Sequence, residues 1–156
     1  MLPESVYSYV DVWQRTQTPS KWLRIPIKEA SAWFDAHGPV DIYMSTGCYN
    51  SKAEGAGYFF FPTIDFDSET LSEALDEAKR VYDHFRGLGV KQEDIRSNFS
   101  GSQGFHLRIS PFAFEENHTH KKFPEFFKSY CKWLKKELEL KTLDLSLYSK
   151  RRLFRS

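Results

Sequence analysis

Apolar and polar positions alternate along the chain in two rhythms, one typical of helices and the other of strands. Apolar residues recur at steps of three and four through residues 71–88 and again through about 124–140. This spacing predicts two amphipathic helices that each bury one face. Ser68 offers an N-cap to the first helix, and Gly87 or Gly89 is expected to end it.

Short apolar runs predict strands around these helices. The run at 58–66 is almost wholly apolar, which is typical of a strand buried on both faces. A glycine-containing stretch at 50–57 predicts a hairpin loop, and residues 112–122 predict a polar loop. The predicted strands are 40–46, 58–66, 95–99, 105–109 and 143–147.

The order of these elements predicts the fold class. Residues 1–39 are expected to form an N-terminal helical segment, because apolar residues between Val6 and Trp13 recur at helical spacing and a short helix is predicted at about 27–36. Residues 40–156 then follow the order β-β-α-β-β-α-β. Strands interspersed with packing helices predict an α/β (α+β) fold, with a mixed sheet covered by helices.

Composition agrees with one compact domain over residues 1–156, because 40% of the residues are hydrophobic and 17% are aromatic. The formal net charge of +1 argues neither for nor against a nucleic-acid partner. Cys48 and Cys131 have no Cys-x-x-Cys partner, which excludes a zinc site built of cysteines and argues against a disulfide framework. With no signal peptide and no apolar run long enough to span a bilayer, we expect a cytoplasmic protein without a membrane partner.

Two aspartates, Asp65 and Asp67, end the most apolar of the predicted strands. Residues i and i+2 of a strand point to the same face, so their carboxylates project side by side, about 6.5 Å apart along the backbone. Neighbouring carboxylates repel each other, and Mg²⁺ or Mn²⁺ relieves that repulsion by binding hard oxygen ligands. A solvated strand end remains the alternative for this pair alone.

A glycine turn follows at Ser100-Gly101-Ser102-Gln103-Gly104, and His106 begins the next strand. Two glycines free the backbone N–H groups to face an anion, while the two serine hydroxyls and His106 add donors for a phosphate oxygen. An ordinary Gly-Ser hairpin with a satisfied histidine is the alternative.

The third segment places Asp144 on an apolar strand, with Arg152 and Arg155 eight and eleven residues later. A buried carboxylate needs a partner or a metal, and arginine forks suit triphosphate oxygens. A basic solvated tail is the alternative for this segment. Together, three carboxylates, an anion cradle and arginines are the parts of a two-metal nucleotidyl-transfer site.

At these residues the chain resembles the archaeo-eukaryotic primase superfamily. This family includes replicative primase small subunits, PrimPol-type primase-polymerases and the polymerase domain of bacterial end-joining ligases. Three motifs carry the resemblance over about residues 40–156. Ile64-Asp65-Phe66-Asp67 is similar to h-h-D-h-D/E, Ser100 to Ile109 to S-G-x-x-G-x-H-h-x-I, and Leu143-Asp144 with Arg152-Leu153-Phe154-Arg155 to h-D followed by R-h-x-R.

The resemblance implies an RRM-like primase catalytic core and a template-dependent nucleotidyltransferase that joins NTPs or dNTPs on a DNA template or primer-template. It implies two Mg²⁺ or Mn²⁺ ions, a nucleoid-associated protein encoded by a plasmid or phage, and a helicase, ligase or accessory primase domain as further partners. The implied metal ligands are Asp65, Asp67 and Asp144, and the implied nucleotide-binding residues are Ser100, Ser102, Gln103, His106, Arg152 and Arg155.

The chain departs from the family pattern at two places. Members often carry Lys or Arg where this chain has Ser102 and Gln103, so Lys52 or Lys150 is expected to supply that charge. The family continues beyond the last motif, whereas this sequence ends at Ser156, so we expect a C-terminally shortened core that lacks an edge strand.

Two other functions stay open from the sequence. One is a non-catalytic module that binds nucleotide or primer-template within a larger replication or repair assembly. The other is a metal-dependent glycosyltransferase, which would account for Asp65 and Asp67 but not for residues 100–109 or Asp144.

Overall fold

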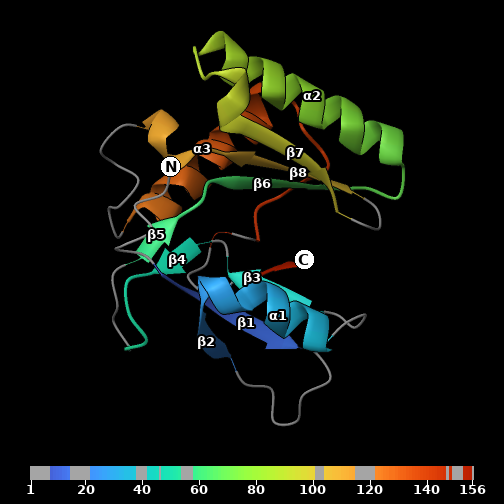
Figure 1. The fold of residues 1–156 in the computed structure, drawn as a ribbon. Helices are drawn as coiled ribbons and strands as arrows, with labels where there is room; N and C mark the ends of the chain where they lie inside the picture. The colour runs from blue at the N-terminus through green and yellow to red at the C-terminus, as the bar shows by residue number, and fades with distance from the viewer. Residues whose placement is uncertain are drawn as a thin grey trace. The chain divides into compact units, whose positions relative to one another are not determined.

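The computed structural model describes residues 8–14, 22–37, 42–45, 47–53, 58–100, 104–114, 122–146, 148 and 153–155. These residues belong to two compact units (Figure 1). The first comprises residues 1–60 with 151–156, and the second comprises residues 61–150. The prediction of one catalytic domain over 1–156 stays a prediction.

The first unit is an antiparallel sheet with one helix. Its strands lie in the order β10-β3-β1-β4-β5, with β2 pairing on β1, and helix α1 (Ile27–His37) packs on β1 and β2. The strands are β1 (Tyr9–Gln14), β2 (Leu23–Pro26), β3 (Ile42–Ser45), β4 (Gly47–Tyr49), β5 (Tyr58–Phe60) and β10 (Leu153–Arg155).

The predicted N-terminal helical segment is wrong before residue 27. β1 pairs with β2, so that Val10 faces Ile25 and Val12 faces Leu23. Val10 and Val12 are both buried, and β-branched side chains fit a pleated, half-buried surface better than a helix. The helix predicted at about 27–36 is confirmed as α1.

The second unit has the element order β-α-β-β-α-β. Its sheet has the order β7-β8-β6-β9, and every pairing is antiparallel. The first and third strands of the unit therefore occupy the centre of its sheet. Its elements are β6 (Thr63–Asp67), α2 (Leu71–Gly87), the 3₁₀ turn η1 (Gln92–Asp94), β7 (Ile95–Phe99), β8 (Gly104–Ile109), α3 (Phe123–Glu137) and β9 (Leu143–Asp144).

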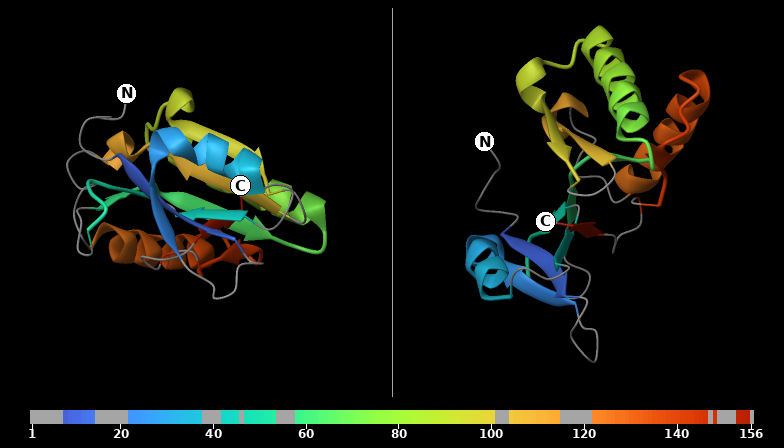
Figure 2. Two further views of the ribbon diagram at one scale, coloured as in Figure 1. Left: turned by 60° about the horizontal axis from the view of Figure 1, so that its bottom comes forward. Right: turned by 90° about the vertical axis from the view of Figure 1, so that its right-hand side faces the viewer.

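Both helices of the second unit lie on the same side of its sheet (Figures 1 and 2). On β6, Ile64 and Phe66 are fully buried, while Asp65 and Asp67 alternate with them and so point to the other face. The core under the helices also includes Leu107, Ile109, Leu143, Ala74, Ala78, Val81, Phe85, Phe123, Phe127, Cys131 and Leu134.

The α+β class is therefore confirmed, with two antiparallel sheets where a mixed sheet was predicted. Both long helices are confirmed, and so are the predicted strands at 95–99 and 105–109. No described helix is long and apolar enough to cross a membrane.

Three boundaries differ from the prediction. The apolar run at 58–66 is two strands in different sheets, because β5 pairs with β4 and β6 pairs with β8 and β9. Pro62, which has no N–H to donate, lies between the two strands. The N-cap of α2 is Thr70, which makes no side-chain cap bond, whereas Ser68 Oγ accepts a hydrogen bond from the N–H of Thr70. The strand predicted at 143–147 is only the two-residue β9.

Candidate functional site

The register of the second unit's sheet places four polar residues in one row across all four strands. Asp65 on β6 pairs with His106 on β8 and with Asp144 on β9, and His106 pairs in turn with Asn98 on β7. Directly opposed residues of antiparallel strands share a face, with Cβ atoms about 4.5–5.5 Å apart. Two predicted metal ligands and the predicted phosphate-binding histidine thus share one sheet face, opposite the helices.

Asp67 lies on the same face, two residues beyond Asp65 and opposite Gly104. A Cβ at Gly104 would stand 1.9 Å from the carbonyl oxygen of Phe66 and 2.5 Å from Asp67 Oδ1. Since no real Cβ atom approaches a backbone oxygen so closely, only glycine fits beside the second carboxylate. The last glycine of the predicted anion turn is therefore required by close packing against β6.

Asp65 is a buried carboxylate in this row. It is 8% exposed, and its Oδ1 atom receives no hydrogen bond within the described residues. His106 Nε2 lies 3.2 Å from that oxygen. A buried carboxylate oxygen without a donor is costly, so Asp65 has the character expected of a cation ligand.

Neighbouring carboxylates also raise the pKa of Asp67. Burial is the largest cause, the carboxylates of Asp65 and Asp144 add to it, and His106 opposes it. The three acids therefore interact electrostatically. A divalent cation would relieve this repulsion, because it offsets the charge of all three groups.

Asp144 is held by its own turn. Its carboxylate accepts hydrogen bonds from the backbone N–H of Ser146, at 2.8 Å, and from the Ser146 hydroxyl. This Asx-type turn ends β9 after two residues. No group of three or more His, Cys, Asp or Glu side chains converges as a ready metal cage in the part of the chain that the structure describes. The metal-ligand roles predicted for Asp65, Asp67 and Asp144 therefore stay predictions, and Asp144 could act as a ligand only by giving up its hydrogen bonds to Ser146.

Glu77 of α2 holds the segment that leads into β9. This carboxylate is 2% exposed and accepts hydrogen bonds from Lys141 N at 2.8 Å, Thr142 N at 2.9 Å and Thr142 Oγ1 at 2.8 Å. Burial pushes the pKa of Glu77 up, but the hydrogen bonds from Lys141 and Thr142 outweigh it and leave the pKa below its ordinary value. Thr142 O in turn accepts from Asp67 N at 2.9 Å, so one clamp links α2, β6 and the strand that carries Asp144.

Sequence reasoning missed both Glu77 and Asn98. Glu77 had a signal, because it lies three residues after Ala74 and four before Val81, on the apolar stripe of its helix. An acid at such a position needs buried partners. Asn98 had none, since only the register of β7 against β8 places it beside His106.

The remaining predicted site residues are only partly described. Ser100 donates its backbone N–H to Gly104 O at 2.9 Å and so closes the turn. Ser102, Gln103 and Arg152 lie outside the described residues. Arg155 belongs to β10 of the first unit, where it pairs with Tyr43 of β3.

Comparison with known proteins adds no relative. The chain matches no protein-family profile, no curated protein and no solved structure. The resemblance to primases therefore depends on the three motifs and stays a prediction.

Proposed function

We propose that the chain is the catalytic core of a template-dependent nucleotidyltransferase of the primase-polymerase type, which joins NTPs or dNTPs. The observation that supports this most is the row formed by Asp144, Asp65 and His106, with Asp67 alongside and Asp65 Oδ1 buried without a hydrogen bond. The three motifs lie far apart in the sequence, and this pairing brings their acids and the histidine onto one face. The β-α-β-β-α-β order is also the one expected of an RRM-like core.

In this proposal Asp65, Asp67 and Asp144 hold two Mg²⁺ or Mn²⁺ ions. Such ions lower the pKa of an attacking 3′-hydroxyl and offset the charge of the leaving pyrophosphate. The hydroxyl oxygen forms a new bond to the α-phosphorus, the bond from that phosphorus to the bridging oxygen breaks, and the hydroxyl proton passes to solvent. The carboxylates fix where this exchange occurs, and the close packing of Gly104 against β6 holds Asp67 beside the turn that precedes β8.

His106 has a double part in this arrangement. Its Nε2 lies 3.2 Å from Asp65 Oδ1, so this nitrogen is close to a carboxylate of the predicted metal site. A cation that occupies Asp65 would free this nitrogen for the triphosphate. The phosphate role of His106 is therefore linked to cation binding.

The test is template-directed incorporation of labelled NTPs and dNTPs, with and without a primer, in Mg²⁺ and in Mn²⁺. Asp65→Asn and Asp67→Asn should abolish incorporation and weaken Mn²⁺ binding measured by electron paramagnetic resonance. Asp76→Asn is the matched control, because Asp76 is an exposed acid on α2. Full incorporation by Asp65→Asn would refute the assignment of the metal ligands.

A non-catalytic module that binds nucleotide or primer-template is the second candidate. The hydrogen bonds that hold Asp144 to Ser146 favour it, since they occupy the third carboxylate. Nucleotide or primer-template binding without incorporation in either metal would select this function.

A further inference from the structure

A second row of side chains on the same sheet face carries positive charge. Arg96 on β7 pairs with Arg108 on β8, and Arg108 pairs with Thr63 on β6. Arg96 and Arg108 each lie two residues from a member of the Asn98–His106–Asp65–Asp144 row. Residues two apart on a strand share a face, so both arginines share the face of the carboxylates.

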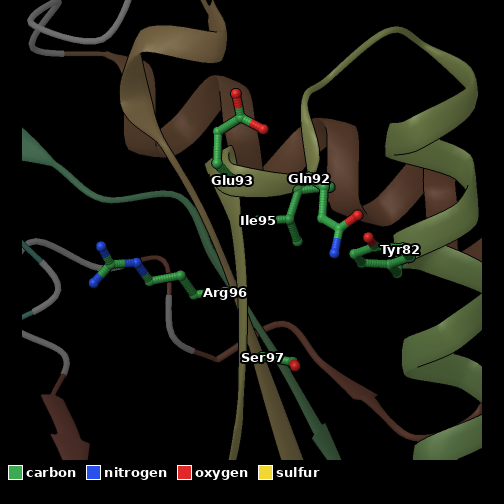
Figure 3. A pocket seen from close by; sticks show the side chains of 6 residues that line it. All are labelled: Tyr82, Gln92, Glu93, Ile95, Arg96 and Ser97. Carbon is green, nitrogen blue, oxygen red and sulfur yellow. The ribbon is translucent and has the colours of Figure 1, made fainter.

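Figure 3 shows the direction of Arg96. Ser97 and Ile95 point to the side of β7 where Tyr82 of α2 lies. An open hollow at this place is lined by Tyr82, Gln92, Glu93, Ile95, Arg96 and Ser97. Arg96 extends to the opposite side of the strand. Its guanidinium therefore leaves the sheet away from the helices, on the face that carries Asp65.

Arg96 and Arg108 occupy directly opposed positions on β7 and β8. Like charges directly opposite each other on antiparallel strands repel. Arg96 is exposed, and within the described residues it makes no ion pair or hydrogen bond. By contrast, Arg80 donates to Leu138 O and Arg86 donates to Val90 O. Arg108 is half-buried and has an interaction of its own. Arg96 is therefore the more accessible of the two side chains for a ligand.

The face thus changes from positive to negative along the strands. The arginine row comes first, the row of His106 and Asp65 follows about 6.7 Å further on, and Asp67 with Gly104 follows by the same step again. Gly104 lies four residues from Arg108 along β8, or about 13 Å. A nucleotide seated at the 100–104 turn is therefore separated from the arginines by the acid row.

We propose that Arg96 and Arg108 bind a backbone phosphate of the nucleic-acid strand that lies across this sheet face. The inference deepens the proposed function and depends on it. A forked guanidinium group matches the oxygens of a phosphate, and the register places the second arginine directly opposite the first. The acids then act at the strand's reacting end, and the arginines hold the chain behind it.

The experiment measures nucleic-acid binding without catalysis. A labelled single-stranded oligonucleotide and a primer-template are titrated with the full chain by fluorescence anisotropy, in EDTA and over a range of salt concentrations. The variants are Arg96→Ala, Arg108→Ala and the double variant, and Lys79→Ala is the control. Lys79 is an exposed residue of α2 that approaches only Asp76, at 4.0 Å, within the described residues, so its removal changes the net charge equally.

The double variant should raise the Kd at least tenfold. Each lost phosphate contact should also reduce the slope of log K against log salt by about 0.7 for a single strand. Arg96→Lys should recover part of the affinity, because it keeps the charge without the fork. Arg96→Ala tests the proposal even if Arg108→Ala is poorly folded, since Arg96 is exposed and its removal should not lower the thermal midpoint.

Equal Kd and equal salt slope for Arg96→Ala and Lys79→Ala would overturn the inference. Strand binding that stays unchanged in the arginine variants, while a labelled nucleotide titrated in Mn²⁺ binds more weakly, would also overturn it, in favour of a contact to the incoming nucleotide. If the unaltered chain bound neither oligonucleotide nor nucleotide, the proposed function itself would fail. Normal binding by the unaltered chain with no effect of the arginine variants would sink only the present inference.

Discussion

Removal of the Glu77 carboxylate should lower the free energy of unfolding more than removal of any other single acid on α2. Glu77→Ala leaves two backbone N–H groups and the Thr142 hydroxyl without an acceptor, all from the segment that leads into β9. A buried donor left unsatisfied costs about 1–3 kcal/mol. Lys141 is exposed and can turn to water, so one of the three losses is largely recovered. The contribution of Arg80, at 3.6 Å and half exposed, is small.

These terms give a loss of about 3–5 kcal/mol in the free energy of unfolding, comparable to the breaking of a buried charged network. Glu77→Gln keeps the shape and one acceptor oxygen but turns an NH₂ toward a donor, so about 2 kcal/mol is expected. Urea denaturation followed by circular dichroism measures both. With a slope near 2 kcal/mol per M, the midpoint for Glu77→Ala should fall by about 2 M.

The loss should also depend on pH. The pKa of Glu77 in the folded state lies below its ordinary value of 4.5. The carboxylate therefore stabilises the fold above pH 4.5, and this stabilisation disappears as the pH falls through the lower, folded pKa. The difference between the unaltered chain and Glu77→Gln should be full at pH 7 and should shrink below about pH 4.

Asp76→Asn is the control for this experiment. The Asp76 carboxylate is 74% exposed, one position before Glu77, and its nearest base is Lys79 at 4.0 Å. Its loss should change stability by no more than about 0.5 kcal/mol. Equal urea midpoints for Glu77→Ala and Asp76→Asn, or a Glu77 deficit that is constant down to pH 3, would refute the reasoning.

Three further variants test other parts of the structure. Gly104→Ala should unfold or strongly destabilise the second unit, because its Cβ would meet the backbone of β6, whereas Gly87→Ala, with nothing within 4 Å, should be tolerated; equal thermal midpoints would contradict this. Asp65→Asn should raise the free energy of unfolding by about 1 kcal/mol while it abolishes incorporation, since it removes a charge whose Oδ1 receives no hydrogen bond; a lowered urea midpoint would contradict it. Asp11→Ala should destabilise the first unit by about 3 kcal/mol, because it leaves Arg24 without the carboxylate that it grips at 2.6 and 3.0 Å; a loss under 1 kcal/mol in urea would contradict it.

Local periodicity was enough to predict the two long helices and the shared sheet face of Asp65 and Asp67. The stripe through residues 71–88 continues for five turns, and no strand could bury it. The i, i+2 rule placed Asp65 and Asp67 on one face without knowledge of any partner strand. These predictions depend only on neighbours in the chain.

Predictions failed where the structure depends on partners distant in sequence. The apolar spacing between Val6 and Trp13 resembles a helix, but β1 gains its burial from pairing with β2, β3 and β4. The run at 58–66 looks continuous, but β5 and β6 pair with strands of different sheets. The row through Asn98 could not be predicted, because a register is a property of two strands and not of either sequence alone.

Apolar and acidic residues alternate along β6, so substitutions in this strand have two kinds of consequence. A change at Ile64 or Phe66 would lower the amount of folded protein, because both side chains are buried. Under the proposed function, a change at Asp65 or Asp67 would leave a folded molecule that cannot join nucleotides. In a cell that also makes the unaltered chain, the first kind would be recessive. The second kind would still occupy any nucleic acid it binds and exclude the working copy. Recessive and dominant substitutions would then alternate from one codon of β6 to the next.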